Sequence, residues 1–450
     1  MTAMKTTPVL ALSCAVLCCS MAVAQSDVPE PEMTLATHTS DEIKEASLKE
    51  SHKIIYLGSD RENAAADSID YLINSFYVDQ YRQFQDPLAP YFLLMSKDAK
   101  LALGIGGAVR MRGWYDFAGS IPVNGFIPYE IPVPKDPSQR RKLDGTPDGT
   151  AVFMRVIGRN RTLGDIVGYI QGNFQGNGHT FKLKKAYVQF KGFTVGWAPT
   201  TLQDADAEAP TIDGAGQNGL LSTTHMLVRW DHRFGKSPWS MAAALEIPTN
   251  QVDADGEQTK KISDWFPDVV AFAQYNFAHS GHLRLTGLFK VLPYRDLITE
   301  KNRNDIGWAV QLSGLAYPIP RLALYLEANT GRGYQSAMGD LSIDNFDLVA
   351  NSDEPGRMYA PLSMGLNVGA KYNFLPNLFA GLALGEAHYF PKYNVRGDSY
   401  KYGLYGAVNL FYEPTPRMQV GIEYLVGSRH NFNREHASAN RIDALFQFSF

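Results

Sequence analysis

Cysteine is absent from this 450-residue chain beyond its first nineteen positions. The three cysteines lie in one apolar stretch and are Cys14, Cys18 and Cys19. A positive charge at Lys5 precedes that stretch, and Ala22-Val23-Ala24 follows it with the small residues that a signal peptidase requires. We therefore predict that residues 1–24 are a signal peptide, cleaved before Gln25. The exported chain would contain no thiol, which excludes a disulfide framework and any cysteine-based metal or nucleophile site.

Long apolar runs and a strong charge of either sign are also missing. After residue 24 no apolar run approaches the roughly 20 residues that a membrane-spanning helix needs. The signal stretch itself is too short for such a helix, and Val16-Leu17 with Ser20 fits the alternative of a lipoprotein signal poorly. The formal net charge of −4, from 42 basic and 46 acidic residues, argues against nucleic acid as a partner.

Signatures of catalysis are sparse. The ten histidines form neither an HExxH motif nor a pair at metal-ligand spacing. The stretch "GIGGAV" lies inside a strand-like pattern and leads to no helix, and "DADGE" lacks the final acid of a calcium loop. A phospholipase-type barrel would need a serine partner for His388, and nothing in the sequence designates one. We therefore predict that the chain is not an enzyme and has no cofactor or metal.

What the sequence does contain is alternation with a period of two. The last ten residues, "RIDALFQFSF", place Ile442, Ala444, Phe446, Phe448 and Phe450 on one parity. Such a pattern predicts a strand with one apolar face. Sixteen segments show it: 101–117, 151–159, 165–174, 181–190, 193–199, 224–233, 238–247, 267–276, 282–291, 306–317, 320–329, 361–373, 377–389, 400–412, 416–428 and 439–450.

Short and long connections alternate strictly between these segments. The short ones are turn-like and read "NRTLG", "KG", "FGKS", "FAHSG", "PIP", "LPN" and "EPTP". The long ones are residues 118–150, 175–180, 200–223, 248–266, 292–305, 330–360, 390–399 and 429–438. Turns at one end and loops at the other, on an even number of strands of about ten residues, are typical of an outer-membrane barrel.

We therefore predict an all-β fold over residues 99–450: a transmembrane antiparallel β-barrel of about 16 strands in the bacterial outer membrane. In hydrocarbon every backbone polar group must be paired internally, so the last strand is expected to close on the first. Aromatic residues near strand ends would form interfacial girdles. The candidates are Trp114, Tyr115, Trp197, Trp230, Trp239, Tyr275, Trp308, Tyr317, Tyr372, Tyr389, Tyr402, Tyr412 and Tyr424.

Residues 25–98 lack the barrel pattern and are predicted to be a periplasmic segment with short helices. The run "SDEIKEASLKESHKII" predicts a short helix with Ser40 as its N-cap. In "DSIDYLINSFYVDQYRQF" the apolar residues recur at i, i+3 and i+4, which predicts an amphipathic helix near 67–86, ended by Pro87. This helix could dock under the barrel, enter it, or pack against copies in a trimer.

A sixteen-stranded barrel leaves an aqueous lumen. The loop at 200–223 follows the fifth strand, and in porin-type barrels such a loop folds into the channel and narrows it. Its acids would then form one side of a constriction and are Asp204, Asp206, Glu208 and Asp213. The alternative is a solvated external loop.

Basic residues outnumber carboxylates on the inward parity of the strands. They are Arg110, Arg112, Arg155, Lys185, Arg229, Arg233, Arg284, Arg321, Lys371 and Arg441. An excess of cations along a pore concentrates anions in it, and arginine binds carboxylate or phosphate bidentately. The alternative is that these residues pair with lumen carboxylates and solvate the wall.

Four stretches of the sequence resemble the DcaP-like family of trimeric outer-membrane porins. They are "GGAVRMRGWYDF", "KLKKAYVQF", "GWAPTTLQDADAEAPTIDGAGQNG" and the terminal "FQFSF". The segment "YLINSFYVDQYRQFQDPLAPYFLLMS" is similar to the region before the barrel in that family, so the resemblance covers roughly residues 65–450. One branch of the family carries an N-terminal coiled coil, which residues 25–60 do not show clearly.

This resemblance implies a homotrimer that passes small anionic solutes, dicarboxylic acids among them. The terminal aromatics also resemble the signal that barrel-assembly machinery recognises in outer-membrane proteins, which would be Phe446, Phe448 and Phe450. Membrane lipid and lipopolysaccharide are the further expected partners. The predicted function is a porin for passive uptake of small hydrophilic solutes, with a preference for anions such as dicarboxylates. The alternative is a plugged or structural barrel, or an adhesin that binds through its outer loops.

Overall fold

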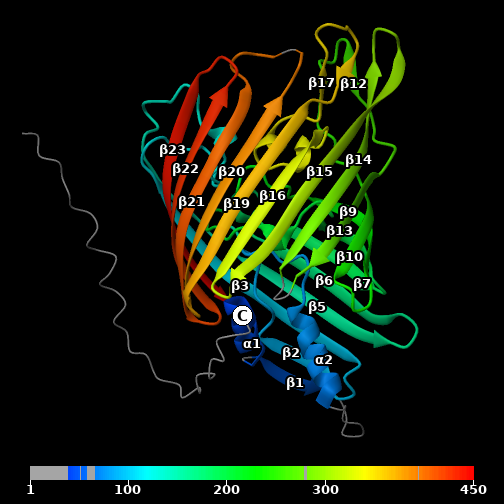
Figure 1. The fold of residues 1–450 in the computed structure, drawn as a ribbon, viewed down its shortest axis with the longest axis vertical. Helices are drawn as coiled ribbons and strands as arrows, with labels where there is room; N and C mark the ends of the chain where they lie inside the picture. The colour runs from blue at the N-terminus through cyan, green and yellow to red at the C-terminus, as the bar shows by residue number, and fades with distance from the viewer. Residues whose placement is uncertain (1–38, 51, 58–65, 278–280, 394) are drawn as a thin grey trace, which may run out of the picture. The chain divides into compact units, whose positions relative to one another are not determined.

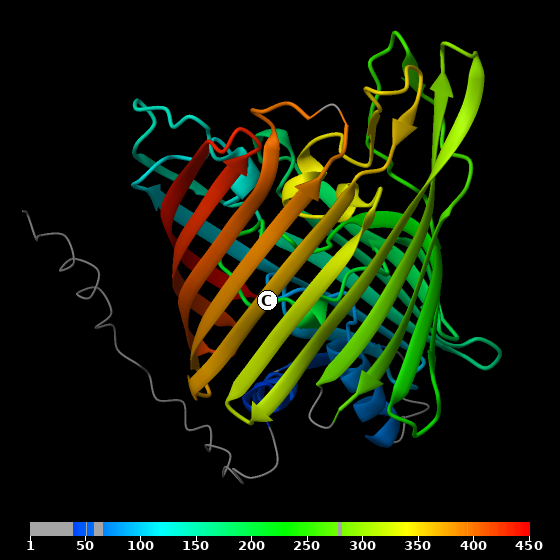
Figure 2. The same cartoon turned by 45° about the horizontal axis from the view of Figure 1, so that its top comes forward.

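The computed structural model describes residues 39–50, 52–57, 66–277, 281–393 and 395–450. The predicted signal peptide, residues 1–24, lies outside the described residues. Sixteen strands form one closed antiparallel barrel, as predicted (Figures 1 and 2). They are β3 (Leu101–Asp116), β5 (Ala151–Asn160), β6 (Gly164–Asn173), β7 (Lys182–Phe190), β8 (Phe193–Pro199), β9 (Thr224–Arg233), β10 (Trp239–Glu246), β13 (Asp268–Asn276), β14 (His282–Asp296), β15 (Lys301–Ile319), β16 (Leu322–Arg332), β19 (Leu362–Leu375), β20 (Leu378–Phe390), β21 (Tyr400–Thr415), β22 (Met418–Asn431) and β23 (His436–Ser449).

Closure joins the two ends of the sheet. Strand β23 pairs with β3 from Arg441 opposite Asp116 to Ser449 opposite Ala108. The backbone groups of Phe450 and Gly107 then exchange hydrogen bonds of 2.9 and 3.0 Å. No sheet edge remains along this seam, which is the condition for a sheet in hydrocarbon.

The predicted strand spans match the observed ones closely, with one clear difference. Strands β14 and β15 extend well past the predicted limits of 291 and 306, because their ladder continues to the pairing of Asp296 with Lys301. The expected loop 292–305 is therefore mostly a hairpin, which projects beyond the barrel rim (Figure 2).

Side chains alternate along the strands as the sequence pattern predicts. On β3, Val109 and Met111 are 39% and 49% exposed, whereas Arg110 and Arg112 between and after them are 3% and 7% exposed. Equivalent apolar positions on the other strands are similarly exposed, including Phe446, Phe448 and Phe450 at the end of β23. An apolar band around a closed barrel faces lipid, so the chain is a barrel of the bacterial outer membrane.

Three aromatic residues predicted for the lipid-facing girdle point inwards instead: Trp114, Tyr389, which is 5% exposed, and Tyr317, whose hydroxyl donates to Asp41 of the segment before the barrel. Trp114 is 2% exposed, and its ring lies 4.9 Å from the guanidinium carbon of Arg112 and 5.0 Å from that of Arg441. Trp114 has the parity of Arg112 and Asp116, whereas Tyr115 has the outward parity. Its indole therefore packs under two cations of the lumen wall.

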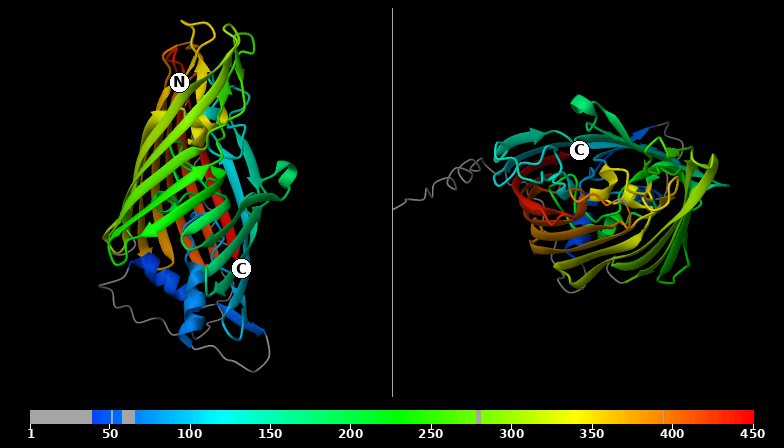
Figure 3. Two further views of the ribbon diagram at one scale, coloured as in Figure 1. Left: turned by 90° about the vertical axis from the view of Figure 1, so that its right-hand side faces the viewer. Right: turned by 90° about the horizontal axis from the view of Figure 1, so that it is seen from above.

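Four elements precede the barrel and lie at its turn end: α1 (Ser40–Glu50), β1 (Lys53–Leu57), α2 (Ala66–Tyr77) and β2 (Phe92–Ser96) (Figures 1 and 3). Strand β2 extends the sheet by pairing with β3, and β1 pairs with β2 in parallel. Thr39 rather than Ser40 caps α1. Its Oγ1 accepts the Glu42 N–H at 3.2 Å, and its own N–H donates to the Glu42 carboxylate at 2.6 Å. This reciprocal arrangement is a capping box.

The amphipathic helix expected near 67–86 ends earlier, at Tyr77. The Arg155 guanidinium from β5 donates to the carbonyls of Phe76 (3.5 Å) and Val78 (2.7 Å), which are groups left unpaired where a helix ends. Asp79 then accepts the Tyr81 N–H at 3.0 Å in a local turn. The wall of the barrel thus ends the helix well before Pro87.

The outer loops carry further short elements. Strand β4 (Lys142–Thr146) pairs with β3, β12 (Thr259–Lys261) pairs with β14, and β11 (Val252–Asp253), β17 (Leu348–Ala350) and β18 (Met358–Tyr359) form a separate small sheet. The short 3₁₀ helices are η1 (Pro128–Glu130), η2 (Asn177–His179), η3 (Ala205–Ala207), η4 (Gln335–Ala337) and η5 (Asp340–Ile343). Among the described residues, every helix is too short or too polar to cross a bilayer.

Candidate functional site

The loop 200–223 between β8 and β9 crosses the inside of the barrel. Its Pro210 carbonyl accepts from the Asn409 amide on β21 at 2.8 Å. The Ile212 N–H donates to Glu423 on β22 at 2.9 Å, and the Leu221 N–H donates to Glu327 on β16 at 3.0 Å. These contacts reach the wall opposite the loop's own strands. The loop is therefore not a solvated external one.

Two of the four loop acids are buried in ion pairs. The Asp204 carboxylate lies 2.8 Å from Nε2 of His282, 2.6 Å from Oγ of Ser313 and 3.3 Å from the Arg284 guanidinium. Burial alone would raise the pKa of Asp204, but the charge of Arg284 and the hydrogen bond from His282 lower it to about 2. Asp204 is therefore ionised at neutral pH and fixes one end of the loop to β14 and β15.

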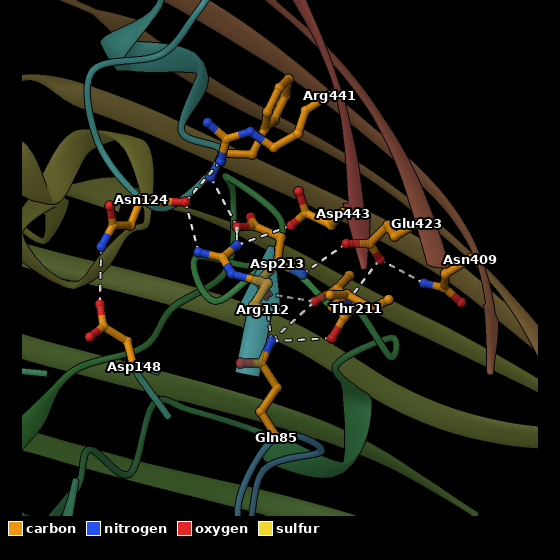
Figure 4. A network of polar contacts seen from close by, with 12 residues as sticks. Gln85, Arg112, Asn124, Asp148, Thr211, Asp213, Asn409, Glu423, Arg441 and Asp443 are labelled. Atoms are coloured by element: carbon orange, nitrogen blue, oxygen red, sulfur yellow. Dashed lines mark hydrogen bonds and ion pairs between the residues drawn. The ribbon is translucent and has the colours of Figure 1, made fainter. Parts of the chain in front are cut away.

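The other buried acid, Asp213, belongs to a network near the seam of the barrel (Figure 4). Its carboxylate accepts from Arg112 and from the Phe126 N–H, each at 2.9 Å. Arg112 also contacts Asp443 at 3.1 Å. The Asn124 carbonyl, in the first outer loop, accepts from both Arg112 (2.7 Å) and Arg441 (2.8 Å). Two loops are thus held against β3 and β23 by shared guanidinium groups.

The remaining loop acids face a space near the turn end of the barrel. Asp206 is exposed, and Glu208 is partly buried and accepts from the Gln203 amide at 2.7 Å. Burial raises the pKa of Glu208 to about 7, against the hydrogen bond from Gln203. Glu208 therefore changes its charge near neutral pH.

From the turn end, a second segment enters the barrel. We call residues 78–91 the strap. Its Gln85 amide donates to the Thr211 carbonyl of the inserted loop at 3.2 Å. Its Asp86 carboxylate lies 2.5 Å from the Lys184 ammonium and 2.7 Å from the Lys185 ammonium on β7. Burial would raise the pKa of Asp86, but these two cations hold it well below its usual range. The strap and the loop therefore meet inside the lumen and are both tied to the wall.

Helix α1 covers part of the same end. Asp41 forms an ion pair with Lys371 on β19 and accepts from the Tyr317 hydroxyl at 3.2 Å. Lys44, one turn further on, forms an ion pair with Glu413 on β21. Two oppositely oriented ion pairs fix the helix to the wall. Loss of either partner of such an ion pair would weaken the attachment of helix α1 to the wall.

The ten predicted pore-lining cations differ in their burial and in their place in the structure. Seven are 7% exposed or less: Arg110, Arg112, Arg155, Lys185, Arg229, Lys371 and Arg441. Arg284 is partly buried and Arg233 is exposed, and both line a cavity. Arg321 is not part of the wall. It lies exposed in the turn between β15 and β16, because β16 begins only at Leu322.

Several of these cations bind backbone carbonyls of the inserted segments rather than facing open water. Arg110 donates to the Ile212 carbonyl at 3.0 Å, and Lys185 donates to the Tyr81 carbonyl. Arg417, which the parity pattern did not bring forward, donates to the Ala89 carbonyl at 3.0 Å. The sequence pattern also missed other polar groups that hold the insertions, namely Lys184, His282, Asn409 and Glu413. Inward parity could have indicated His282, Asn409 and Glu413. Lys184 has the opposite parity to Lys185 and lies at a register shift between β6 and β7, which the alternation does not reveal.

Cavities remain on either side of the layer that the loop 200–223 and the strap form inside the barrel. One of about 350 Å³ lies toward the turn end, and its charged lining is Asp206, Arg229, Asp231, Arg233 and Arg284. A neighbouring cavity of about 330 Å³ shares Asp206 and is also lined by residues of α1 and the strap. On the loop side a cavity of about 420 Å³ is lined by aromatic rings and by charged residues of both signs, which are Asp253, Asp344, Arg396, Asp398 and Arg429. In the part of the chain that the structure describes, no three His, Cys, Asp or Glu residues are arranged to hold a metal ion.

Comparisons with solved structures agree with this architecture. The outer membrane channel DcaP of Acinetobacter baumannii superposes with a TM-score of 0.66 at 18% identity, over 78% of this chain and 98% of that one. The anion-selective porin from Comamonas acidovorans gives a TM-score of 0.50 at 10% identity, over 78% and 100% of the two chains. OmpF of Salmonella typhi in complex with daunomycin gives 0.50 at 11% identity, over 78% and 98%.

The chain has a porin fold. At these identities the likeness concerns architecture alone. No family model matches the sequence, and no curated protein matches it. What passes through this porin-fold barrel is therefore argued from its own residues.

Proposed function

We propose that this barrel is an outer-membrane channel for passive uptake of small hydrophilic solutes, with a preference for anions such as dicarboxylates. The observation that carries the proposal is the arginine-lined cavity of about 350 Å³ toward the turn end. Three guanidinium groups from β9 and β14 face it, and arginine is the side chain that best matches a carboxylate.

Three arginines and three carboxylates, Asp204, Asp206 and Asp231, balance one another at this cavity, so its preference for anions depends on which cation a solute can reach. Arg229 is paired with Asp231 at 2.5 Å, and Arg284 lies 3.3 Å from Asp204. Among the described residues, Arg233 has no carboxylate within 4.0 Å and is exposed at the cavity. An accessible cation in a confined, partly desolvated space raises the local concentration of anions. We assign the first contact with an anionic solute on this side to Arg233.

The inserted layer favours a second candidate, a barrel that is closed until the strap or helix α1 moves. The lumen on the turn side is occupied by the strap, whose Asp86 is held by two lysines, and by α1. The adhesin alternative has no comparable support among the described residues. A homotrimer, as in the family that the sequence resembles, is the assembly we propose.

The test is the reversal potential of the mature protein in a planar bilayer under a KCl gradient, repeated with succinate. Stepwise conductance with a chloride-selective potential, and block by succinate, are the expected results. The variant Arg233→Gln should lose much of the selectivity. Its matched control is Arg321→Gln, which removes an exposed arginine from a turn outside the lumen.

Two outcomes would count against the proposal in different ways. Cation selectivity in the native barrel would refute the anion preference. Correctly folded barrels with no conductance at any voltage would instead support the closed barrel.

A further inference from the structure

The outward face of the last four strands carries a row of polar rings. His388 on β20, Tyr402 on β21, His430 on β22 and His436 on β23 are direct cross-strand neighbours. The ring centroids of Tyr402 and His430 are 4.3 Å apart and those of His430 and His436 are 5.1 Å apart, with interplanar angles of 8° and 9°. Four adjacent strands thus share one stacked band. Stacked rings present their edges, where imidazole N–H groups lie, to the surroundings, except that Nε2 of His388 is buried and its Nδ1 lies 3.4 Å from Glu386.

This band lies just beyond the apolar belt. Leu404 on β21 and Val426 on β22 have the same outward parity and are 42% and 43% exposed. Tyr402 is two residues past Leu404, which is about 7 Å along a strand. The band is on the loop side of the belt, at the level where hydrocarbon gives way to headgroups. Polar rings at this level meet lipid headgroups rather than acyl chains.

Two lysines lie beside the band. A register shift at Lys401 interrupts the pairing of β21 with β22, and its ammonium lies 5.9 Å from the centre of the Tyr402 ring. At the β23 end, the Lys135 ammonium donates to the hydroxyl of Ser438 at 3.3 Å, two residues from His436 on the same face, and to the Ala118 carbonyl at 3.2 Å. The positive charge of these two lysines makes the band a site for anions.

A cavity of about 460 Å³ adjoins the band beside β23. Phe117, which has the outward parity of β3, lines it together with Ser438, Lys135 and Arg140. The rest of the lining is apolar except for Ser120, Asp136 and Gln139. A hollow on the membrane side that combines apolar wall residues with two cations and one carboxylate carries a net positive charge, which matches an amphiphile with a negatively charged head.

Carboxylates on the same elements are few and mostly engaged. Glu386 lies 3.4 Å from His388, and Asp136 accepts from the backbone and hydroxyl of Ser138 at 2.8 and 2.7 Å. Glu435 accepts from the Asn433 amide at 2.9 Å. The cations therefore remain available to an external anion.

We propose that this outer-face patch binds the phosphorylated headgroup of a glycolipid in the outer leaflet. The patch consists of Lys135, Arg140, Lys401, His430 and His436. Lysine and arginine ammonium and guanidinium groups would pair with the phosphates, the imidazole edges would donate hydrogen bonds, and the apolar hollow would take the start of an acyl chain. This site lies outside the lumen and does not depend on the proposed transport.

The test uses the mature protein in detergent and measures binding of lipid A by native mass spectrometry. The double variant Lys135→Glu with Arg140→Glu should weaken binding of diphosphorylated lipid A more than tenfold, since each basic residue contributes about fivefold at a membrane surface. The matched control is Lys236→Glu with Arg321→Glu, two exposed charges on turns at the other end of the barrel, which should bind as the native protein does. Heat-modifiable migration in gels verifies that every variant is folded.

Dephosphorylated lipid A separates phosphate recognition from simple apolar contact. The native protein should bind it as weakly as the double variant does. Equal affinity of the native protein for the two lipids would overturn the proposal. So would a double variant that keeps its affinity but loses its oligomeric state, because the patch would then be a contact between copies of the chain.

Discussion

Removing the Asp86 carboxylate is expected to release the strap from the lumen. In Asp86→Asn the side chain keeps its size and its ability to hydrogen-bond, but the ammonium groups of Lys184 and Lys185 lose their counter-charge. Lys185 is 1% exposed, whereas the Lys184 side chain is 28% exposed and can rehydrate. Removing one partner of a buried ion pair costs about 3–5 kcal/mol. Because Lys184 can rehydrate, the low end applies, about 3 kcal/mol.

A cost of about 3 kcal/mol raises the equilibrium constant for strap release by a factor of about 150, since about 1.4 kcal/mol corresponds to tenfold. Amide hydrogen exchange across residues 79–90 measures this directly, because exchange in the docked strap proceeds through its release. We expect exchange there to accelerate about a hundredfold while the barrel strands remain protected. Channel openings in a planar bilayer should become more frequent.

The matched control is Asp136→Asn, which removes an exposed carboxylate from the first outer loop. It should leave strap exchange unchanged. If Asp86→Asn exchanged at the native rate, the ion pairs of Asp86 would not be what holds the strap. Faster exchange without any change in channel openings would mean that the strap does not obstruct the pathway.

Further predictions concern charge in the lumen. Burial raises the pKa of Glu208 to about 7. A change of pH from 6 to 8 should therefore add negative charge beside the anion cavity and reduce chloride selectivity. The variant Glu208→Gln should not show this pH dependence. The folded-state pKa of Asp86 is depressed, so its contribution to docking is complete above the unfolded value of about 3.9 and is lost only as pH falls through the lower folded value. Strap exchange, corrected for intrinsic rates, should therefore be the same at pH 5 and pH 7. Arg112→Glu should place a third carboxylate beside Asp213 and Asp443 and destabilise the barrel by more than about 3 kcal/mol, visible as a lower urea midpoint of heat-modifiable migration.

The barrel was predictable because its pattern is local. Period-two alternation and the sorting of turns from loops require only neighbouring residues, and they gave all sixteen strands. The inward position of Trp114 was also readable, since it has the parity of Arg112. Arg321 was misplaced because parity was extended past the end of a strand into a turn.

The partners of the lumen cations were not predictable in the same way. Arg112 binds Asp213, 101 positions away in the sequence, and Arg110 binds a backbone carbonyl at Ile212. Nothing in the sequence marks a carbonyl as an acceptor for a distant arginine. The end of α2 at Tyr77 has the same origin, because Arg155 competes for its last carbonyls although the apolar periodicity continues.

Recognition of the strap through its main chain has a consequence for sequence variation. Arg155, Lys185 and Arg417 donate to carbonyl oxygens, which every amino acid supplies. Side chains at Val78 and Ala89 can therefore be exchanged while the corresponding wall contacts persist. The side chains that do contact the wall include those of Asp79, Tyr81, Phe84 and Asp86. A foreign peptide of equal length that keeps Asp79, Tyr81, Phe84 and Asp86 would therefore meet the same donors and rings of the wall. Homologous barrels that keep Arg155, Lys185 and Arg417 but differ in the sequence of the strap would be the natural counterpart of such a peptide replacement.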